Sequence, residues 1–365
     1  MSVSLLRTVA FSVAAAALMV FFGMPAAKAH PPLPGTCSTT TPLDCRYSPV
    51  FSFSDIHIFD TIFRDPSRSN YPVPIRVRYA RDVPAGPRPV VIFNHGGMTN
   101  ANGRTGSSEW STLMAKAGYI VVHPSRLPVP NPAAFTTTCQ DNEVSTDPGP
   151  CAAFVGHHLY GPMNTDFLIS LFPQITARVQ ANDPLMLGSL NRNKVIVAGW
   201  SGGSSVVAAN AGAWKQFADA GPVYDFKTTR PIGFFGVSTQ GPDYAGFSGG
   251  FRSLSYDGID NRPFLTITGK GDTNGKFSEG RTVAFLRSTS GGKYLSWDTL
   301  LHPNHATMNH SDCATPIRLL HCQYIESAGL AFLDAVAWNL GAAKRWLASD
   351  AYITLTQGAI ELHRR

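Results

Sequence analysis

The pattern of apolar and polar positions predicts two kinds of β-strand. Residues 74–79 alternate between apolar and charged side chains, which is typical of a strand with one exposed face. Residues 90–93 are apolar without alternation, as expected of a strand that is buried on both faces. Further buried strands are predicted at residues 119–122, 194–198, 232–237, 264–268 and 294–301.

Segments with helical periodicity separate these strands. Apolar residues recur at intervals of three or four over residues 110–117, which predicts a helix between two buried strands. Strands that alternate with helices indicate an α/β fold, with a mostly parallel central sheet and helices on both faces. Other helices are expected from about residue 164 (divided at Pro173), after residue 201, and over 324–347 (broken near Gly341).

The first 29 residues have the pattern of an export signal. Arg7 precedes an apolar run over residues 9–22, and Ala-Lys-Ala at 27–29 is the small-x-small pattern that signal peptidase recognises. The apolar run is shorter than the ~20 residues that a membrane-spanning helix needs. We therefore expect cleavage after Ala29 and a secreted or periplasmic protein without a stable membrane anchor. The remaining residues, 30–365, are expected to form a single domain.

Charge and composition give no sign of a nucleic-acid partner. The formal charge is +6, and removing Arg7 and Lys28 with the leader leaves about +4. The remaining lysines and arginines are spread along the chain, whereas a nucleic-acid surface usually clusters them. Residues 124–162, rich in proline, threonine and asparagine, are expected to form an inserted loop region.

All six cysteines follow the predicted leader. An even number of cysteines in an exported chain predicts disulfides, and near neighbours are expected to pair, although six cysteines allow fifteen pairings. No C-x-x-C pair or Cys/His cluster suggests a metal site. The expected pairs are Cys37 with Cys45, Cys139 with Cys151, and Cys313 with Cys322.

The strongest chemical signal is Gly199-Trp200-Ser201-Gly202-Gly203. It matches G-x-S-x-G and lies between a predicted buried strand and a predicted helix. A serine on so tight a turn needs small neighbours, which the glycines supply, and it lies at a helix N-terminus that can receive negative charge. Ser201 is therefore the candidate nucleophile, and the amide of Gly202 is a candidate oxyanion donor.

A second glycine-rich loop, Asn94-His95-Gly96-Gly97, directly follows the first buried strand. Loops in this position supply the other backbone N–H to a tetrahedral oxyanion. We expect His95 to have a structural role, with its imidazole hydrogen-bonded beneath the loop. Its place well before Ser201 does not suit the catalytic base of this kind of fold.

The candidate acid is Asp272, which ends a loop after the buried strand at residues 264–268. From this position a carboxylate can orient the catalytic imidazole and stabilise its charged form. The sequence at 272–275 also resembles part of a calcium loop, but the other ligands of such a loop are missing. Weaker candidates for the acid are Asp257, Asp260 and Asp298.

The base is expected in the segment 302–310, which holds three histidines. His305 lies a short turn past the last predicted strand and is the preferred candidate. His310 remains the alternative base, and His302, at the strand end before a proline, is the weakest of the three. The chain order Ser201, Asp272, His305 is the one that α/β-hydrolases use.

These motifs resemble those of the predicted dienelactone hydrolases, and of the related platelet-activating-factor acetylhydrolase-like and cutinase-like esterases. The resemblance spans about residues 60–347. It implies an α/β-hydrolase fold without a cofactor, with the nucleophile, acid and base on Ser201, Asp272 and His305. It also implies oxyanion donors on the amides of Gly97 and Gly202. The stretches that carry it are DPSR (65–68), PVPIRV (72–77), PVVIFNHGG (89–97), VAGWSGG (197–203), TITGKGD (266–272) and KYL (293–295).

The sequence thus predicts a secreted serine hydrolase that cleaves carboxylic esters through a Ser-His-Asp triad and an acyl-enzyme. Its expected partner is a small-molecule or polymeric ester, with Trp200 and Met98 as candidate substrate-binding residues and a monomer as the default. Two alternatives remain: an amidase or peptidase with the same triad, and a non-catalytic binding protein that has the α/β-hydrolase fold.

Overall fold

The computed structural model describes residues 45–68, 70–83, 85–97, 102–126, 161–216, 223–241, 249–273 and 278–365. The predicted leader at 1–29, Met98, and residues 127–160 of the inserted region lie outside the described residues. Three of the cysteines also lie outside them: Cys37, Cys139 and Cys151.

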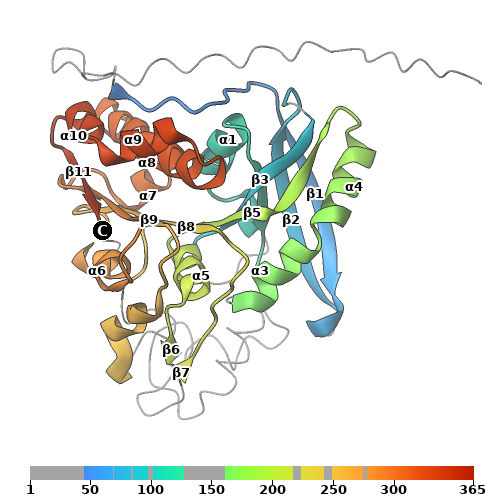
Figure 1. The fold of residues 1–365 in the computed structure, drawn as a ribbon, viewed down its shortest axis with the longest axis horizontal. Helices are drawn as coiled ribbons and strands as arrows, with labels where there is room; N and C mark the ends of the chain where they lie inside the picture. Colours follow the sequence, from blue (N-terminus) through green and yellow to red (C-terminus); the bar gives the residue numbers. More distant parts are fainter. Residues whose placement is uncertain are drawn as a thin grey trace, which may run out of the picture.

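A nine-stranded sheet forms the centre of the described part, in the order β1-β2-β4-β3-β5-β8-β9-β10-β11 (Figure 1). Neighbouring strands from β4 to β10 are parallel, and the pairs β1–β2, β2–β4 and β10–β11 are antiparallel. The predicted α/β class with a mostly parallel sheet is therefore confirmed. The strands are β1 (Ile56–Asp65), β2 (Tyr71–Ala80), β3 (Gly86–Asn94), β4 (Ile120–Pro124), β5 (Gly188–Trp200), β8 (Gly233–Val237), β9 (Phe264–Gly269), β10 (Lys293–Asp298) and β11 (Ile360–Arg364); β6 (Lys215–Gln216) and β7 (Val223–Tyr224) form a separate pair.

Helices cover both faces of the sheet (Figure 1). Trp110 of α1 and Leu333 of α8 belong to the core on one face, whereas Phe172 of α4 lies in the core on the other. The helices are α1 (Ser108–Lys116), α3 (Gly161–Ser170), α4 (Phe172–Asn182), α5 (Gly202–Ala211), α6 (Val283–Arg287), α7 (His305–Met308), α8 (Pro316–Ala337), α9 (Gly341–Ala348) and α10 (Ala351–Thr356).

The central strands are apolar because successive side chains enter opposite cores. Val91 and Phe93 of β3 pack with α1 and α8, whereas Val90 and Ile92 face α3 and α4. All four side chains are fully buried. A strand covered on both faces has no solvent-exposed side, which explains why no polar alternation is visible in its sequence.

Some helix and strand ends differ from the predicted ranges because local hydrogen bonds at the ends determine where the element begins or stops. Helix α8 begins well before residue 324, because the Thr315 side chain accepts a hydrogen bond from the Arg318 amide and Pro316 suits the first turn. Strand β10 stops short of residue 301, and there the Asp298 carboxylate accepts from the Leu300 amide at 2.9 Å. The divisions predicted at Pro173 and Gly341 are confirmed by the gaps between α3 and α4 and between α8 and α9.

One of the predicted disulfides lies within the described residues. Cys313 and Cys322 are bonded, which confirms that pair and ties the segment after α7 to α8. Cys45 is also disulfide-bonded.

A buried carboxylate anchors residues 45–50, here called the N-terminal segment, to the helices on one face of the sheet. Asp334 of α8 is fully buried and accepts hydrogen bonds from Tyr47 and Tyr119, each at 2.7 Å, and from the Val50 amide at 3.2 Å. Burial, together with the charge of Asp334, raises the pKa of both tyrosines. Both hydroxyls therefore stay protonated as donors, and Asp334 joins the N-terminal segment, the start of β4 and α8.

Replacing Asp334 with Ala is expected to lower the free energy of unfolding by about 2–5 kcal/mol. Two buried hydroxyls would lose their acceptor, at about 1–3 kcal/mol each. Tyr47→Phe should cost less, because it removes only one of these bonds. Urea unfolding measures the difference, with Glu361→Ala on β11 as the control, since that side chain is 50% exposed and should change stability by about 0.5 kcal/mol or less. Equal stability of the Asp334 and Glu361 variants would contradict the anchoring role.

Candidate active site

Ser201 occupies the turn between β5 and α5, in a strained backbone conformation. Its φ of 54° and ψ of −121° are rare for a residue with a side chain. The Ser201 amide donates to the carbonyl of Val237 in β8 at 3.0 Å, and the Ser201 carbonyl accepts from the Ser204 amide at 2.8 Å as the helix begins. These bonds hold the turn in its strained conformation, with the hydroxyl at the helix N-terminus.

The glycines around Ser201 allow backbones to pack in direct contact. A Cβ at Gly203 would lie 2.1 Å from the carbonyl oxygen of Asn94, and one at Gly202 would lie 2.4 Å from that of Gly97. A Cβ at Gly199 would lie 2.5 Å from the Gly203 oxygen. No side chain fits at these distances, so the sequence G-x-S-G-G is what lets α5 lie against the loop after β3.

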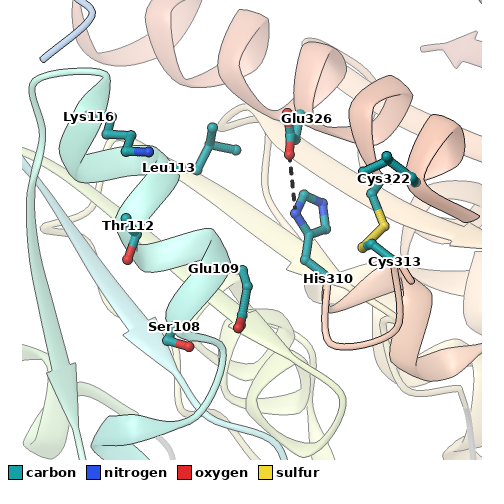
Figure 2. Close-up of a pocket in the computed structure, with 10 residues that line it drawn as sticks. Ser108, Glu109, Thr112, Leu113, Lys116, His310, Cys313, Cys322 and Glu326 are labelled. Carbon is teal, nitrogen blue, oxygen red and sulfur yellow. Dashed lines mark ion pairs between the residues drawn. A yellow bond between two sulfur atoms is a disulfide. The ribbon is translucent and has the colours of Figure 1, made fainter. Parts of the chain in front are cut away.

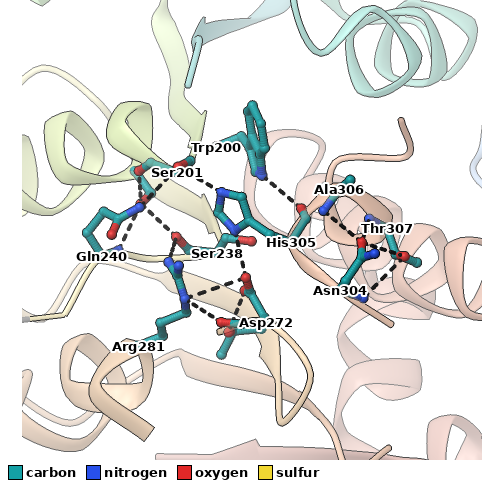
Figure 3. Close-up of polar contacts among 12 residues, drawn as sticks. Trp200, Ser201, Ser238, Gln240, Asp272, Arg281, Asn304, His305, Ala306 and Thr307 are labelled. Carbon is teal, nitrogen blue, oxygen red and sulfur yellow. Dashed lines mark hydrogen bonds and ion pairs between the residues drawn. The ribbon is translucent and has the colours of Figure 1, made fainter. Parts of the chain in front are cut away.

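The structure brings the predicted nucleophile, base and acid together in one hydrogen-bonded chain (Figure 3). His305 Nε2 lies 2.9 Å from Ser201 Oγ, and His305 Nδ1 lies 2.7 Å from Asp272 Oδ1. Asp272 has no exposed surface, whereas 15% of the His305 side chain is exposed. With a carboxylate at Nδ1, the neutral imidazole carries its proton there and leaves Nε2 as the acceptor for the serine hydroxyl.

Groups around Asp272 fix the carboxylate in place. Thr268, at the end of β9, donates its hydroxyl to Asp272 Oδ2 at 2.8 Å. Arg281, in the 3-10 helix η7 (Ser278–Thr282), is buried; its Nε donates to the Asp272 carbonyl at 2.7 Å and lies 3.5 Å from Oδ1. Thr268 and Arg281 thus hold the Asp272 side chain and backbone in position next to the histidine.

The short helix α7 sets the position of His305. Asn304 caps this helix: its side chain accepts from the amides of Ala306 and Thr307, and the Thr307 hydroxyl accepts from the Asn304 amide. Trp200 packs on the imidazole with ring centroids 4.9 Å apart, and its indole N–H donates to the His305 carbonyl at 3.3 Å. The candidate substrate-binding residue Trp200 therefore also contacts the histidine directly.

A buried histidine and an arginine form hydrogen bonds that hold the loop after β3 in place. The amide of Arg126 donates to His95 Nε2 at 3.1 Å, and His95 Nδ1 lies 2.7 Å from the Gly96 carbonyl. The Arg126 guanidinium donates to the carbonyls of His95 and Gly97, at 2.5 and 2.7 Å. Burial, and then the charge of Arg126, lowers the pKa of His95 well below its ordinary value, so the ring is neutral and structural, as predicted.

The two candidate oxyanion donors lie side by side next to the turn at Ser201. Gly97 has a φ of +71°, and its amide nitrogen is 3.0 Å from the position of a Cβ on Gly202. Within the described residues, neither the Gly97 nor the Gly202 amide donates a hydrogen bond to another protein group. Gly202 is buried whereas Gly97 is exposed, so the two adjacent N–H groups lie at the edge of the site, where both can donate to an oxygen brought there.

Sequence reasoning missed one polar group that reaches Ser201. Gln240, in the turn after β8, donates its carboxamide N–H to Ser201 Oγ at 3.1 Å (Figure 3). The sequence offered one signal for this residue, which is a polar turn directly after a buried strand, like the loop that carries Asp272. To identify Gln240 as a neighbour of Ser201, one must know that β8 pairs with β5, and local sequence patterns do not reveal this pairing.

The alternative base, His310, lies between α1 and α8 and does not contact Ser201. It stacks on Trp110 of α1 with ring centroids 4.5 Å apart, and its Nδ1 lies 3.4 Å from Glu326 of α8. Both His310 and Glu326 line a pocket of about 400 Å³ between α1 and α8 (Figure 2). Burial lowers the pKa of His310 to about 4, so its ring is neutral at pH 7.

The other sequence candidates are engaged elsewhere or exposed. Asp257 and Asp260 form ion pairs with Arg287 and Arg262, and Asp298 is hydrogen-bonded to His321. His302 is exposed. The structure therefore brings only Asp272, of the acids considered, into contact with His305.

In the described part of the chain, no cluster of three or more His, Cys, Asp or Glu side chains is able to hold a metal ion. None of the described helices combines the length and the apolar character needed to cross a lipid bilayer. Compared with known proteins, the sequence matches no family model, and no curated protein is similar to it at a significant level. Function must therefore be argued from the geometry of the site.

The buried His310 predicts a loss of stability in mild acid. Its pKa of about 4 in the folded chain lies below its ordinary value of 6.5, so between these values the unfolded chain binds a proton that the folded chain excludes. Stability should fall with decreasing pH across this range, with up to about 3 kcal/mol from His310. His310→Asn, which tolerates the left-handed φ of 62°, should show a shallower pH dependence.

Urea unfolding at several pH values tests this comparison. Burial raises the pKa of Glu326, which therefore acts with the opposite sign, but it is present in both proteins. The buried His95 and His123, whose pKa values burial also lowers, are likewise present in both. Parallel pH profiles for the wild type and the His310 variant would contradict the prediction.

Proposed function

We propose that the protein is a serine hydrolase of the α/β-hydrolase fold that cleaves carboxylic esters. The observation that carries the proposal is the chain Ser201–His305–Asp272, with contacts of 2.9 and 2.7 Å. The nucleophile turn after a central parallel strand supports the fold assignment, as does the order serine, aspartate, histidine along the chain. The resemblance to secreted esterases points the same way.

In the proposed reaction, Ser201 attacks the carbonyl carbon of the ester while its proton passes to His305 Nε2. Asp272 keeps the imidazole in the required tautomer and stabilises the imidazolium that forms. His305 then gives this proton to the leaving alkoxide, which departs as an alcohol and leaves an acyl-enzyme. A water molecule, deprotonated by His305, attacks the acyl-enzyme; the bond from the carbonyl carbon to Ser201 Oγ then breaks, His305 returns the proton to Oγ, and the carboxylic acid is released.

The amides of Gly97 and Gly202 are the proposed donors to the oxyanion. Their adjacency and their lack of other acceptors within the described residues support this role. Gly202 is also the first residue of α5, so the partial positive charge of the helix N-terminus adds to the stabilisation. Losing one such donor typically lowers the rate by about 10² to 10³.

Export to an oxidising compartment is part of the proposal. The Cys313–Cys322 bond supports it, because structural disulfides are rare in reducing compartments. The substrate in this proposal is a soluble or polymeric ester, and the proposed chemistry needs no cofactor, since serine, imidazole, carboxylate and amides supply every proton transfer and charge contact.

Ser201→Ala is expected to reduce hydrolysis of p-nitrophenyl acetate and butyrate by about 10⁴ or more, because the variant has no nucleophile. It should also abolish labelling by a fluorophosphonate probe, which the wild type should accept. Ser349→Ala, at the exposed C-terminal end of α9, is the matched control and should keep both activities. Full activity of the Ser201 variant would rule out the proposed nucleophile.

The same assays separate the two alternatives. A peptidase or amidase would cleave a p-nitroanilide at a rate comparable with the matched p-nitrophenyl ester, whereas the proposed esterase should strongly prefer the ester. A non-catalytic binding protein would leave both substrates intact and would not react with the fluorophosphonate. A series of acyl chain lengths, with a polyester film alongside, then defines the ester class.

A further inference from the structure

Gln240 is a polar side chain in contact with the proposed nucleophile and has no part in the triad or the oxyanion site. Its carboxamide nitrogen lies 3.1 Å from Ser201 Oγ, on a different element from His305 (Figure 3). The residue is 6% exposed, so this contact is formed away from bulk water. Among the residues that the structure describes, Ser201 Oγ therefore has two neighbours within hydrogen-bond distance, the His305 imidazole and the Gln240 carboxamide.

The turn that carries Gln240 is held rigidly. The Gln240 amide donates to Ser204 Oγ at 3.1 Å, and the Gln240 carbonyl accepts from the buried Tyr256 hydroxyl at 2.5 Å. The Ser204 hydroxyl donates in turn to the Ser201 carbonyl at 2.5 Å. Helix α5 and the 3-10 helix η6 (Gly249–Gly258) therefore both fix the backbone of Gln240 relative to the nucleophile.

Strain and a buried charge fix the same turn from its other side. Ser238 has a φ of 51°, a left-handed conformation that persists only where its surroundings enforce it. Its amide donates to the Ile267 carbonyl at 2.7 Å, and its carbonyl accepts from the Arg281 guanidinium at 2.8 Å. Since Arg281 also binds the carbonyl of Asp272, the turn and the acid loop are held by one cation.

The donors and acceptors around Ser201 Oγ determine the direction of each hydrogen bond to this oxygen. In a neutral imidazole that donates from Nδ1 to Asp272, Nε2 is the acceptor and takes the hydrogen bond from the serine hydroxyl. The second partner at the oxygen must then be a donor, which the carboxamide N–H of Gln240 is. A donor in this place cannot take the serine proton, so it directs the hydroxyl hydrogen toward the histidine.

We propose that Gln240 is a catalytic residue, whose N–H stabilises the negative charge that develops on Ser201 Oγ during attack. The inference rests on the proposed function. As the O–H proton moves to His305 Nε2, Oγ forms its bond to the carbonyl carbon, and the π pair of the carbonyl moves to its oxygen. The Gln240 N–H bond stays intact throughout and acts only through its hydrogen bond.

The first test measures the rate at which the nucleophile is acylated. Gln240→Met, which keeps an unbranched side chain of similar size but has no donor, should lower the acylation rate constant for p-nitrophenyl acetate by about ten- to a hundredfold. Labelling by a small fluorophosphonate, in which Ser201 Oγ displaces fluoride from phosphorus, should slow by a similar factor. The dissociation constant of the substrate, measured in the same single-turnover experiments, should change by less than about threefold, because the proposed bond is to the enzyme's own oxygen.

A second variant separates donation from shape. Gln240→Glu has nearly the same volume, but its carboxylate accepts instead of donating and competes with His305 for the serine proton. The rate of this variant relative to the wild type should rise as the pH is lowered from about 8 to about 5, because protonating the carboxylate restores a donor. The relative rate of Gln240→Met should stay constant over the same range.

Gln174→Glu is the matched control, since Gln174 is exposed on α4 and the same charge change there should leave the acylation rate unchanged. Thermal unfolding of each variant checks the fold, and Gln240→Asn, which keeps the amide but is too short to reach Oγ, provides a second loss of the contact. Wild-type labelling rates in Gln240→Met, a loss confined to the dissociation constant of the substrate, or a pH-independent ratio for Gln240→Glu would each overturn the inference. A wild type that is not labelled at all would overturn the proposed function as well.

Discussion

The close contact between α5 and the loop after β3 is the constraint on which the site depends. The carbonyl of Asn94 occupies the space where a side chain on Gly203 would begin, at 2.1 Å. Only because this position is glycine can the helix start immediately after the strand and lie against the loop. That packing places Ser201 on a strained turn and brings Gly97 beside Gly202. The arrangement of the hydroxyl and the two amides therefore depends on this close approach of two backbones.

The parallel sheet explains why the other polar groups reach the same place. Strands β5, β8, β9 and β10 are consecutive neighbours in the sheet and run in one direction, so their carboxyl ends share an edge. Ser201, Gln240, Asp272 and His305 follow these four strands in that order. Each loop supplies one group, and the buried Arg281 joins two of the loops. The site is thus assembled from segments far apart in sequence by strand order alone.

The parts that could be predicted from the sequence are those with a local signal. Buried strands such as 90–93 are continuous apolar runs, and the turn at Ser201 has its glycines within five residues, so both can be recognised without knowing the fold. Strand β1 was missed because apolar residues such as Ile58 and Ile62 lie on its exposed side, which hides the alternation. The contact of Gln240 with Ser201 depends on which strands are neighbours, and no local pattern carries that information. The sequence likewise left the choice between His305 and His310 open. In the structure, His310 packs on Trp110 and does not contact Ser201.

The anchoring of the N-terminal segment by Asp334 has a consequence for how the chain folds. Tyr47 and its acceptor are 287 positions apart, and the bond from the Trp346 indole to the Cys45 carbonyl spans 301. A nascent chain leaving the ribosome cannot form either link until almost all of it has been synthesised. Closing loops of this length carries an entropic cost before any contact is gained, and contacts so distant in sequence slow folding. The first residues of the described segment are thus among the last able to reach their final place.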